Sequence, residues 1–142
     1  GLPKGPAMDL AVRMATEAGV TDIHPVIVRR SVATGDRSER WQRIAAAACA
    51  QCKRPDVPTV HAPATLLEAI EALPEGLQRI VALLSGTEHQ LRTGPTVVAI
   101  GPEGGFTDAE CQLFTRHGFT AARFGRWVFR TETAVAAVLS RF

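Results

Sequence analysis

Two segments in the last third of the chain carry the residue types that a ligand-binding or catalytic site needs. The first has the sequence GPEGGF over residues 101–106 and directly follows the apolar run Thr96–Ile100. Glycines let the backbone approach a ligand closely and adopt positive φ, and ligands of open α/β sheets bind at the carboxyl ends of strands. The segment is neither GxGxxG nor a phosphate-binding loop with its Lys, so it carries no dinucleotide or triphosphate signature. A tight turn that binds no ligand is the alternative.

The second segment packs four polar side chains into the entrance of an expected helix, with the sequence RTETA over residues 130–134. Thr131 or Thr133 can cap this helix, and Glu132 is favourable at its positive end. Helix capping does not explain the presence of Arg130, because a cation at a helix N-terminus is unfavourable. Its position favours an anionic partner such as a phosphate or a carboxylate.

Alternating helical and strand patterns must position both segments. We expect helices over Met8–Ala18, Ser38–Cys52, Leu66–Leu73, 107–117 and Thr131–Phe142, and strands over Ile23–Val28, Val57–His61, Gln78–Leu84, Thr96–Ile100 and Phe119–Phe124. Capping boxes are expected where Thr65 precedes Glu68 and where Thr107 precedes Glu110. The polar stretch Ser85–Pro95 is expected to be a loop. The alternation predicts an α/β fold with a mainly parallel sheet and helices on both faces.

Length and composition limit the class of protein. The 142 residues suffice for one domain with a proper core. The net charge of +2 permits nucleic-acid binding without arguing strongly for it. No apolar run approaches the ~18 residues of a membrane span, so no membrane partner is expected.

The number and spacing of the cysteines and histidines do not predict a metal site. The odd count of 3 Cys fits a reduced cytosolic protein. Cys49 and Cys52 form a CxxC late in an expected helix, away from the helix N-terminus that lowers a thiol pKa, and no second CxxC completes a zinc site. We expect packed thiols there. Satisfied or solvated side chains are likewise expected, rather than ligands, at His24, His61, His89 and His117.

Together, the two segments resemble the ribosomal RNA small-subunit methyltransferase E family, within the knotted SPOUT class of methyltransferases. The family pattern of GPEGG followed by LGxR(I/V)LRTETA is matched in full at 101–105 and 130–134. Shorter matches precede these in order, at KG (4–5), ATEAGV (15–20), RSV (30–32), WQRIA (41–45) and VP (57–58). Departures from the usual family residue occur at Arg29, Ala50, Lys53, Trp127 and Phe129.

The resemblance implies a fold, an activity and partners. It implies a C-terminal trefoil knot, a homodimer in the cytoplasm, and transfer of a methyl group from S-adenosylmethionine to N3 of a uridine in small-subunit ribosomal RNA, free or in the assembled subunit. Family members also have an N-terminal β-barrel that binds RNA. The resemblance therefore implies that residues 1–5 are a linker from such a domain and that 6–142 are the SPOUT methyltransferase domain.

The resemblance also implies site residues. We expect the cofactor pocket to be lined by Leu83, Leu84, Ile100, Gly101, Pro102, Glu103, Gly104, Gly105, Phe124, Gly125, Val128, Phe129, Thr131 and Thr133. Arg130 is expected to stabilise the charge of a uridine deprotonated at N3, and Glu132 to act as the general base or to position the base edge. A carboxylate that only favours the helix N-terminus is the alternative for Glu132. Glu103 can instead be structural, accepting backbone N–H groups of its own loop.

We also expect an RNA-binding face, and three alternative functions remain open. Arg29, Arg30 and Arg126 are expected to contact RNA, with a solvated charged surface as the alternative. A SPOUT enzyme acting on a different RNA, such as transfer RNA, is one alternative function. A non-catalytic paralogue that binds RNA or cofactor is another, and a dimerisation domain with a vestigial site is the third.

Overall fold

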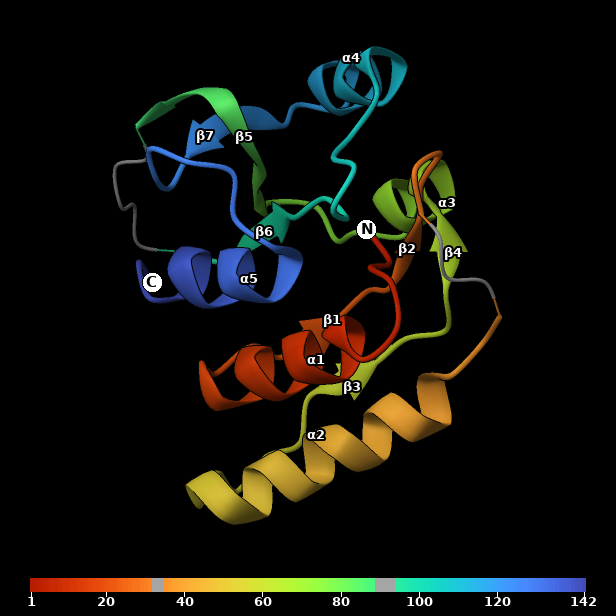
Figure 1. The fold of residues 1–142 in the computed structure, drawn as a ribbon, viewed down its shortest axis with the longest axis vertical. Coiled ribbons are helices and arrows are strands. Elements are labelled where there is room, and N and C mark those ends of the chain that lie inside the picture. The colour runs from red at the N-terminus through yellow and green to blue at the C-terminus, as the bar shows by residue number, and fades with distance from the viewer. Residues whose placement is uncertain (32–34, 89–93) are drawn as a thin grey trace.

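Helices and strands alternate along the chain in the computed structural model, which describes residues 1–31, 35–88 and 94–142 (Figure 1). The helices are α1 (Ala7–Glu17), α2 (Ser38–Cys52), α3 (Leu66–Glu71), α4 (Asp108–Arg116) and α5 (Thr131–Leu139). The strands are β1 (Asp22–Ile23), β2 (Val26–Ile27), β3 (Thr59–Val60), β4 (Ala64–Thr65), β5 (Gln78–Glu88), β6 (Thr96–Ala99) and β7 (Thr120–Arg123).

All strand pairs among the described residues are parallel, which confirms the predicted fold class. The central sheet has the order β6-β5-β7, and two short pairs, β1-β3 and β2-β4, lie apart from it. The strand expected over Ile23–Val28 is divided into β1 and β2. Pro25 lies between them, and a proline has no backbone N–H to donate to a strand ladder.

Both faces of the central sheet are buried. Val81 pairs with Ala99 and Ala121, and this row packs against Phe114 of α4. On the opposite face, Ile80 is 5% exposed. Continuous apolar strands of this kind are typical of a parallel sheet covered on both sides.

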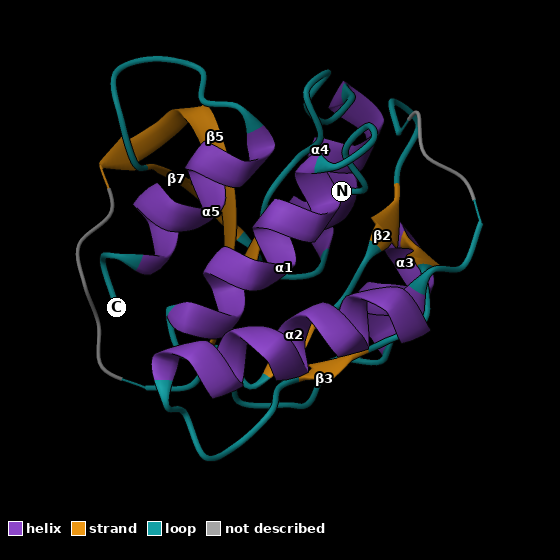
Figure 2. Ribbon diagram, turned by 60° about the horizontal axis from the view of Figure 1, so that its bottom comes forward, coloured by secondary structure: helices purple, strands orange, loops and turns teal. Residues whose placement is uncertain are grey.

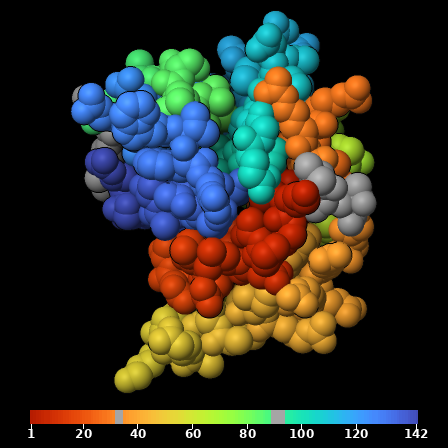
Figure 3. All heavy atoms as spheres, viewed as in Figure 1, coloured from red at the N-terminus to blue at the C-terminus, as the bar shows by residue number. Residues whose placement is uncertain are grey.

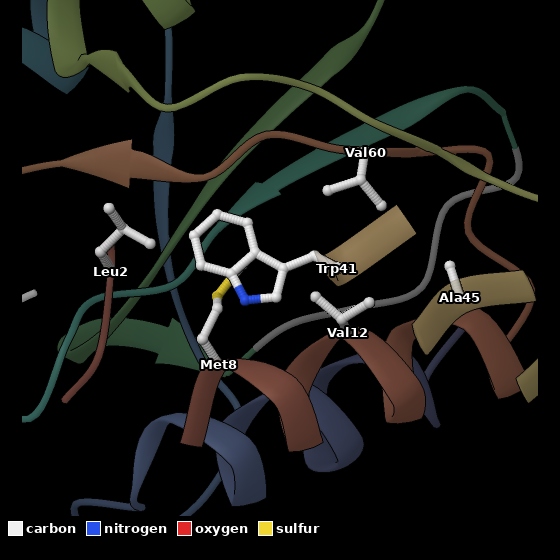
Figure 4. Packing of buried hydrophobic residues seen from close by; sticks show 6 residues of the cluster. All are labelled: Leu2, Met8, Val12, Trp41, Ala45 and Val60. Atoms are coloured by element: carbon white, nitrogen blue, oxygen red, sulfur yellow. The ribbon is translucent and has the colours of Figure 1, made fainter. Parts of the chain in front are cut away.

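The N-terminal half has its own core around an indole ring. Trp41 of α2 is 3% exposed and packs with Leu2, Met8, Val12, Ala45 and Val60 (Figure 4). Figure 2 shows α1 beside α2 on one side and beside α5 on the other. Ala11 and Ala15 of α1 contact Val135 of α5, so α1 joins this core to the C-terminal segments.

Local signals set most element boundaries as predicted. The bounds of α2 match the prediction, and both capping boxes, Thr65 with Glu68 and Thr107 with Glu110, are present. The loop expected over Ser85–Pro95 is wrong in part, because β5 continues through Glu88; residues 89–93 of that stretch lie outside the described residues. The strand β4 was not predicted, and α5 ends at Leu139 rather than at Phe142.

The structure bears in different ways on the expectations for the cysteines, for membrane-spanning helices and for the knot. Cys49 is buried as a packed thiol, but Cys52 is exposed, so the prediction is wrong for the second thiol. Among the described residues no helix is long and apolar enough to cross a membrane. The trefoil knot implied by the resemblance is not visible in this structure and stays a prediction.

Candidate functional site

Three segments follow the strands at the carboxyl edge of the central sheet. Because β5, β6 and β7 are parallel, their carboxyl ends lie at one edge, and the ladder pairs Val81 with Ala99 and Ala82 with Ala122 there. Beyond these pairs come the β5 bulge (residues 83–86), the glycine loop (residues 100–106) and the α5 entry loop (residues 124–130) (Figure 1). This is the edge at which open parallel sheets bind ligands.

The glycine loop closes on itself through a tight turn. The Gly105 N–H donates to the carbonyl oxygen of Pro102 at 2.8 Å, and Gly105 has φ +67°, the left-handed region that favours glycine. A Cβ at Gly101 would lie 3.2 Å from Cα of Gly105. Two of the three glycines are therefore explained by the fold of the loop itself.

The third glycine makes room for an arginine. Arg30 Nη1 donates to the carbonyl oxygen of Gly104 at 2.7 Å and to that of Phe106 at 3.4 Å. A Cβ at Gly104 would lie 3.1 Å from Cβ of Arg30. Arg30 thus braces the glycine loop, a contact that the sequence did not suggest.

Glu103 binds outside its own loop. Its Oε1 accepts the backbone N–H of Lys4 at 3.2 Å. The suggestion that it accepts backbone N–H groups of its own loop is therefore wrong. In the space-filling view, the glycine loop is exposed beside the first residues of the chain and the α5 entry region (Figure 3).

One hydrogen bond joins the two segments that the sequence singled out. Thr131 Oγ1 donates to the carbonyl oxygen of Gly101 at 3.1 Å, and Thr131 is 5% exposed. The N-cap of α5 is Arg130, and no side chain caps it, so the alternative in which Thr131 or Thr133 caps the helix is wrong. Thr131 instead fixes the start of α5 against the glycine loop.

The α5 entry loop has a packed base and an exposed apolar tip. The ring of Phe129 lies so close to Gly125 that a Cβ there would meet its Cζ at 2.5 Å. Trp127 and Val128, in contrast, are 75% and 76% exposed. The backbone at Gly125 is thus specified by packing, while the tip is available to a partner.

Arg130 and Glu132 lie beside this junction without partners in the part of the chain that the structure describes. Arg130 is exposed and Glu132 is half-buried, and neither side chain has a hydrogen bond or ion pair there. Glu132 lies in the first turn of α5, where the helix dipole favours a carboxylate. The structure therefore places a cation and a carboxylate, both open to a ligand, next to the glycine loop.

The β5 bulge is the third segment at this edge of the sheet. Pairing with β7 shifts from Ala82↔Ala122 to Thr87↔Ala122, so the residues between leave the ladder. Leu83 packs on the core, whereas Leu84 is 44% exposed. A Cβ at Gly86 would lie 2.6 Å from the backbone N of Ala122, so this position requires glycine. Gly86 was expected in a loop and was not singled out from the sequence.

The predicted RNA-contacting arginines do not form one cluster. The Arg29 backbone N–H donates to Glu110 Oε1 at 2.7 Å, so the turn after β2 holds the N-terminus of α4. Burial favours the neutral form of Glu110, but the N–H groups of Thr107 and Arg29 outweigh it and lower the carboxyl pKa below its usual value. Arg126 lies on the α5 entry loop, apart from this turn, and is exposed.

Surface depressions lie elsewhere in the described chain. One lies between α1 and α2, lined by Ile44 and Gln51 among others, and another lies on α4 around Cys111 and Thr115. Neither includes a residue of the three segments, and neither brings together side chains with an evident chemical role. The converging segments, rather than these depressions, are the candidate site.

Comparisons with known proteins find similar sequences and structures along the whole chain. The sequence model of a family described as an RNA methyltransferase domain matches residues 1–142. The ribosomal RNA small subunit methyltransferase E of Synechocystis sp. is 33% identical over 99% of this chain and 50% of its own length.

Two solved structures are similar to the whole chain. The ribosomal RNA small subunit methyltransferase E of Neisseria gonorrhoeae, bound to S-adenosyl methionine, has a TM-score of 0.91 and is 32% identical over 99% of this chain. A methyltransferase from Legionella pneumophila, in complex with the same cofactor, has a TM-score of 0.89 and 31% identity over 98% of this chain. The chain spans 61% of each of these structures.

Proposed function

Because the chain belongs to the RNA methyltransferase domain family, we propose that it carries the methyl-transfer site of an S-adenosylmethionine-dependent small-subunit ribosomal RNA methyltransferase. The observation that supports this most directly is the Thr131–Gly101 hydrogen bond. It holds the entry of α5 against the glycine loop at the edge of the sheet where ligands bind.

The residues present fit this cofactor. Leu84 offers an exposed apolar side chain and Gly101–Gly105 an open, closely approachable backbone, the combination that holds an adenine ring by its faces and edges. Bound there, S-adenosylmethionine supplies a methyl group already activated by its sulfonium. The other members of the proposed pocket lie on the same three segments or on the first turn of α5.

The acceptor that we propose is N3 of a uridine. This nitrogen carries a proton that must leave, and the resulting charge spreads over the two carbonyl oxygens of the ring. Glu132 accepts the N3 proton, and Arg130 stabilises the charge on the carbonyl oxygens. The support for these roles is that both side chains lie beside the glycine loop with no partner among the described residues.

RNA and a second copy of the chain are the partners in this proposal. Arg126 and Arg29, exposed on different loops, contact phosphates, and Arg30 adds charge while bracing the glycine loop. Trp127 and Val128 leave an apolar tip beside the site, which supports burial against a second protomer in a homodimer. The proposal places the protein in the cytoplasm, where its ribosomal substrate is.

Methyl transfer to isolated small ribosomal subunits tests this function. The protein is incubated with methyl-labelled S-adenosylmethionine and subunits that lack the modification, and the modified position is mapped by primer extension. A methyl group on N3 blocks the Watson–Crick edge, so the proposal expects one strong stop at a uridine. Absence of label in the RNA, or label on another base, contradicts the proposed reaction.

A further inference from the structure

Strand register brings three metal-binding residue types together away from the methyl-transfer site. β1 pairs in parallel with β3, with Asp22 opposite Thr59 and Ile23 opposite Val60. The His61 N–H donates to the carbonyl oxygen of Ile23 at 3.0 Å, which holds His61 beside the end of β1. Asp22 and His24 are two residues apart along one strand direction, so they point to the same side.

The three side chains are in close mutual contact. The rings of His24 and His61 stack with centroids 4.0 Å apart and an angle of 8° between their planes. Asp22 Oδ1 lies 2.9 Å from His61 Nε2. One ligand atom from each residue lies within 4.8 Å of the others.

The surroundings leave the cluster accessible. The side chains of His61 and Asp22 are 40% and 49% exposed, and His24 is half-buried. His24 has no hydrogen-bond partner within residues 1–31, 35–88 and 94–142, although its ring is packed on His61. A nitrogen of His24 therefore stays available beside a second imidazole and a carboxylate.

We propose that Asp22, His24 and His61 bind one divalent transition-metal ion of the zinc class. Two imidazole nitrogens and one carboxylate oxygen are a donor set that Zn²⁺ accepts, with a water molecule as the fourth ligand. With metal–ligand bonds of about 2.1 Å, a tetrahedral ion holds its ligand atoms about 3.4 Å apart. The ligand atoms lie within 4.8 Å of one another, so reaching that value requires the side chains to rotate and the two imidazole rings to leave their parallel stack.

The ion has a structural effect in this proposal. It links β1 to β3, and Ile23 and Val60 of these strands pack on the same core as Trp41. A ligand that binds the folded but not the unfolded chain stabilises the fold. Metal binding therefore strengthens the N-terminal half of the domain without taking part in methyl transfer.

Calorimetric titration of Zn²⁺ into the protein tests the proposal. Thiols also bind zinc, so the titration uses a Cys52→Ser, Cys111→Ser background, in which only the buried Cys49 remains. We expect one ion per chain and, at a hundredfold excess over Kd, a rise in Tm of about 5–10 °C. His61→Gln and His24→Gln are each expected to weaken binding at least tenfold, which at the same zinc concentration removes about half or more of the Tm rise.

Two further variants separate metal binding from folding. Asp22→Asn keeps the shape of the side chain and its contact with His61, and is expected to weaken binding about tenfold in a protein with the wild-type circular dichroism spectrum. His117→Gln, at the end of α4, is the control and leaves affinity unchanged. Wild-type affinity in both Asp22→Asn and His24→Gln, or the absence of binding in the Cys52→Ser, Cys111→Ser background, overturns the proposal.

Discussion

Replacing Thr131 by Val removes one hydroxyl and nearly no volume, and so isolates the bond between α5 and the glycine loop. Thr131 is 5% exposed, and its Oγ1 lies 3.1 Å from the Gly101 carbonyl oxygen. A typical hydrogen bond contributes about 0.5–1.5 kcal/mol, and a buried acceptor left without its donor costs about 1–3 kcal/mol. We therefore expect the free energy of unfolding to fall by about 1–2 kcal/mol.

The same change is expected to weaken binding of S-adenosylmethionine about tenfold, since 1.4 kcal/mol corresponds to a factor of ten in affinity. Urea denaturation gives the stability and isothermal titration calorimetry gives the affinity. Thr115→Val is the matched control, because Thr115 Oγ1 donates to the Cys111 carbonyl oxygen on the exposed side of α4, where water replaces it. The control is expected to change stability by less than about 0.5 kcal/mol. A Thr131→Val protein with wild-type stability and cofactor affinity refutes the idea that this bond holds the two segments together.

Three other predictions concern single positions in the chain. Glu132→Gln is expected to lower the rate of methyl transfer about 10²–10⁴-fold while leaving cofactor affinity unchanged, and a near wild-type single-turnover rate excludes Glu132 as the base. Gly105→Ala is expected to cost about 1–2 kcal/mol in urea denaturation, because Gly105 has φ +67°; an unchanged midpoint argues against this turn. Because the pKa of Glu110 is lowered on folding, its stabilising contribution is present above its ordinary pKa of 4.5 and is lost as pH falls below it. Glu110→Gln, which cannot titrate, is expected to flatten this part of the stability profile, and identical acid profiles of the two proteins contradict the assignment.

Local signals made much of the fold predictable. The helix Ser38–Cys52 and both capping boxes depend on residues within a few positions of one another, and they form as expected. The apolar pattern over Ile23–Val28 predicts one continuous strand, but Pro25 in its middle divides it into β1 and β2. β5 was predicted too short, since its last residues are held by renewed pairing with β7, which the sequence of β5 does not contain.

The site could be predicted only in part, because it depends on contacts between residues that lie far apart in the sequence. The two loops were identified from their residue types, but the bond between Thr131 and Gly101 spans 30 positions and specifies a geometry that neither loop shows alone. Arg30 was predicted as an RNA contact, yet it binds the glycine loop 74 positions away. His61 lies 39 positions from Asp22, and only the register of β1 and β3 brings them together.

Hydrogen–deuterium exchange with and without S-adenosylmethionine reports where on the chain the cofactor binds. We expect bound cofactor to protect amides of residues 83–86, 100–106 and 124–133 and to leave exchange in α2 unchanged. The assignment of the site is contradicted if saturating cofactor protects amides of the depression between α1 and α2 instead, or leaves these three segments unprotected.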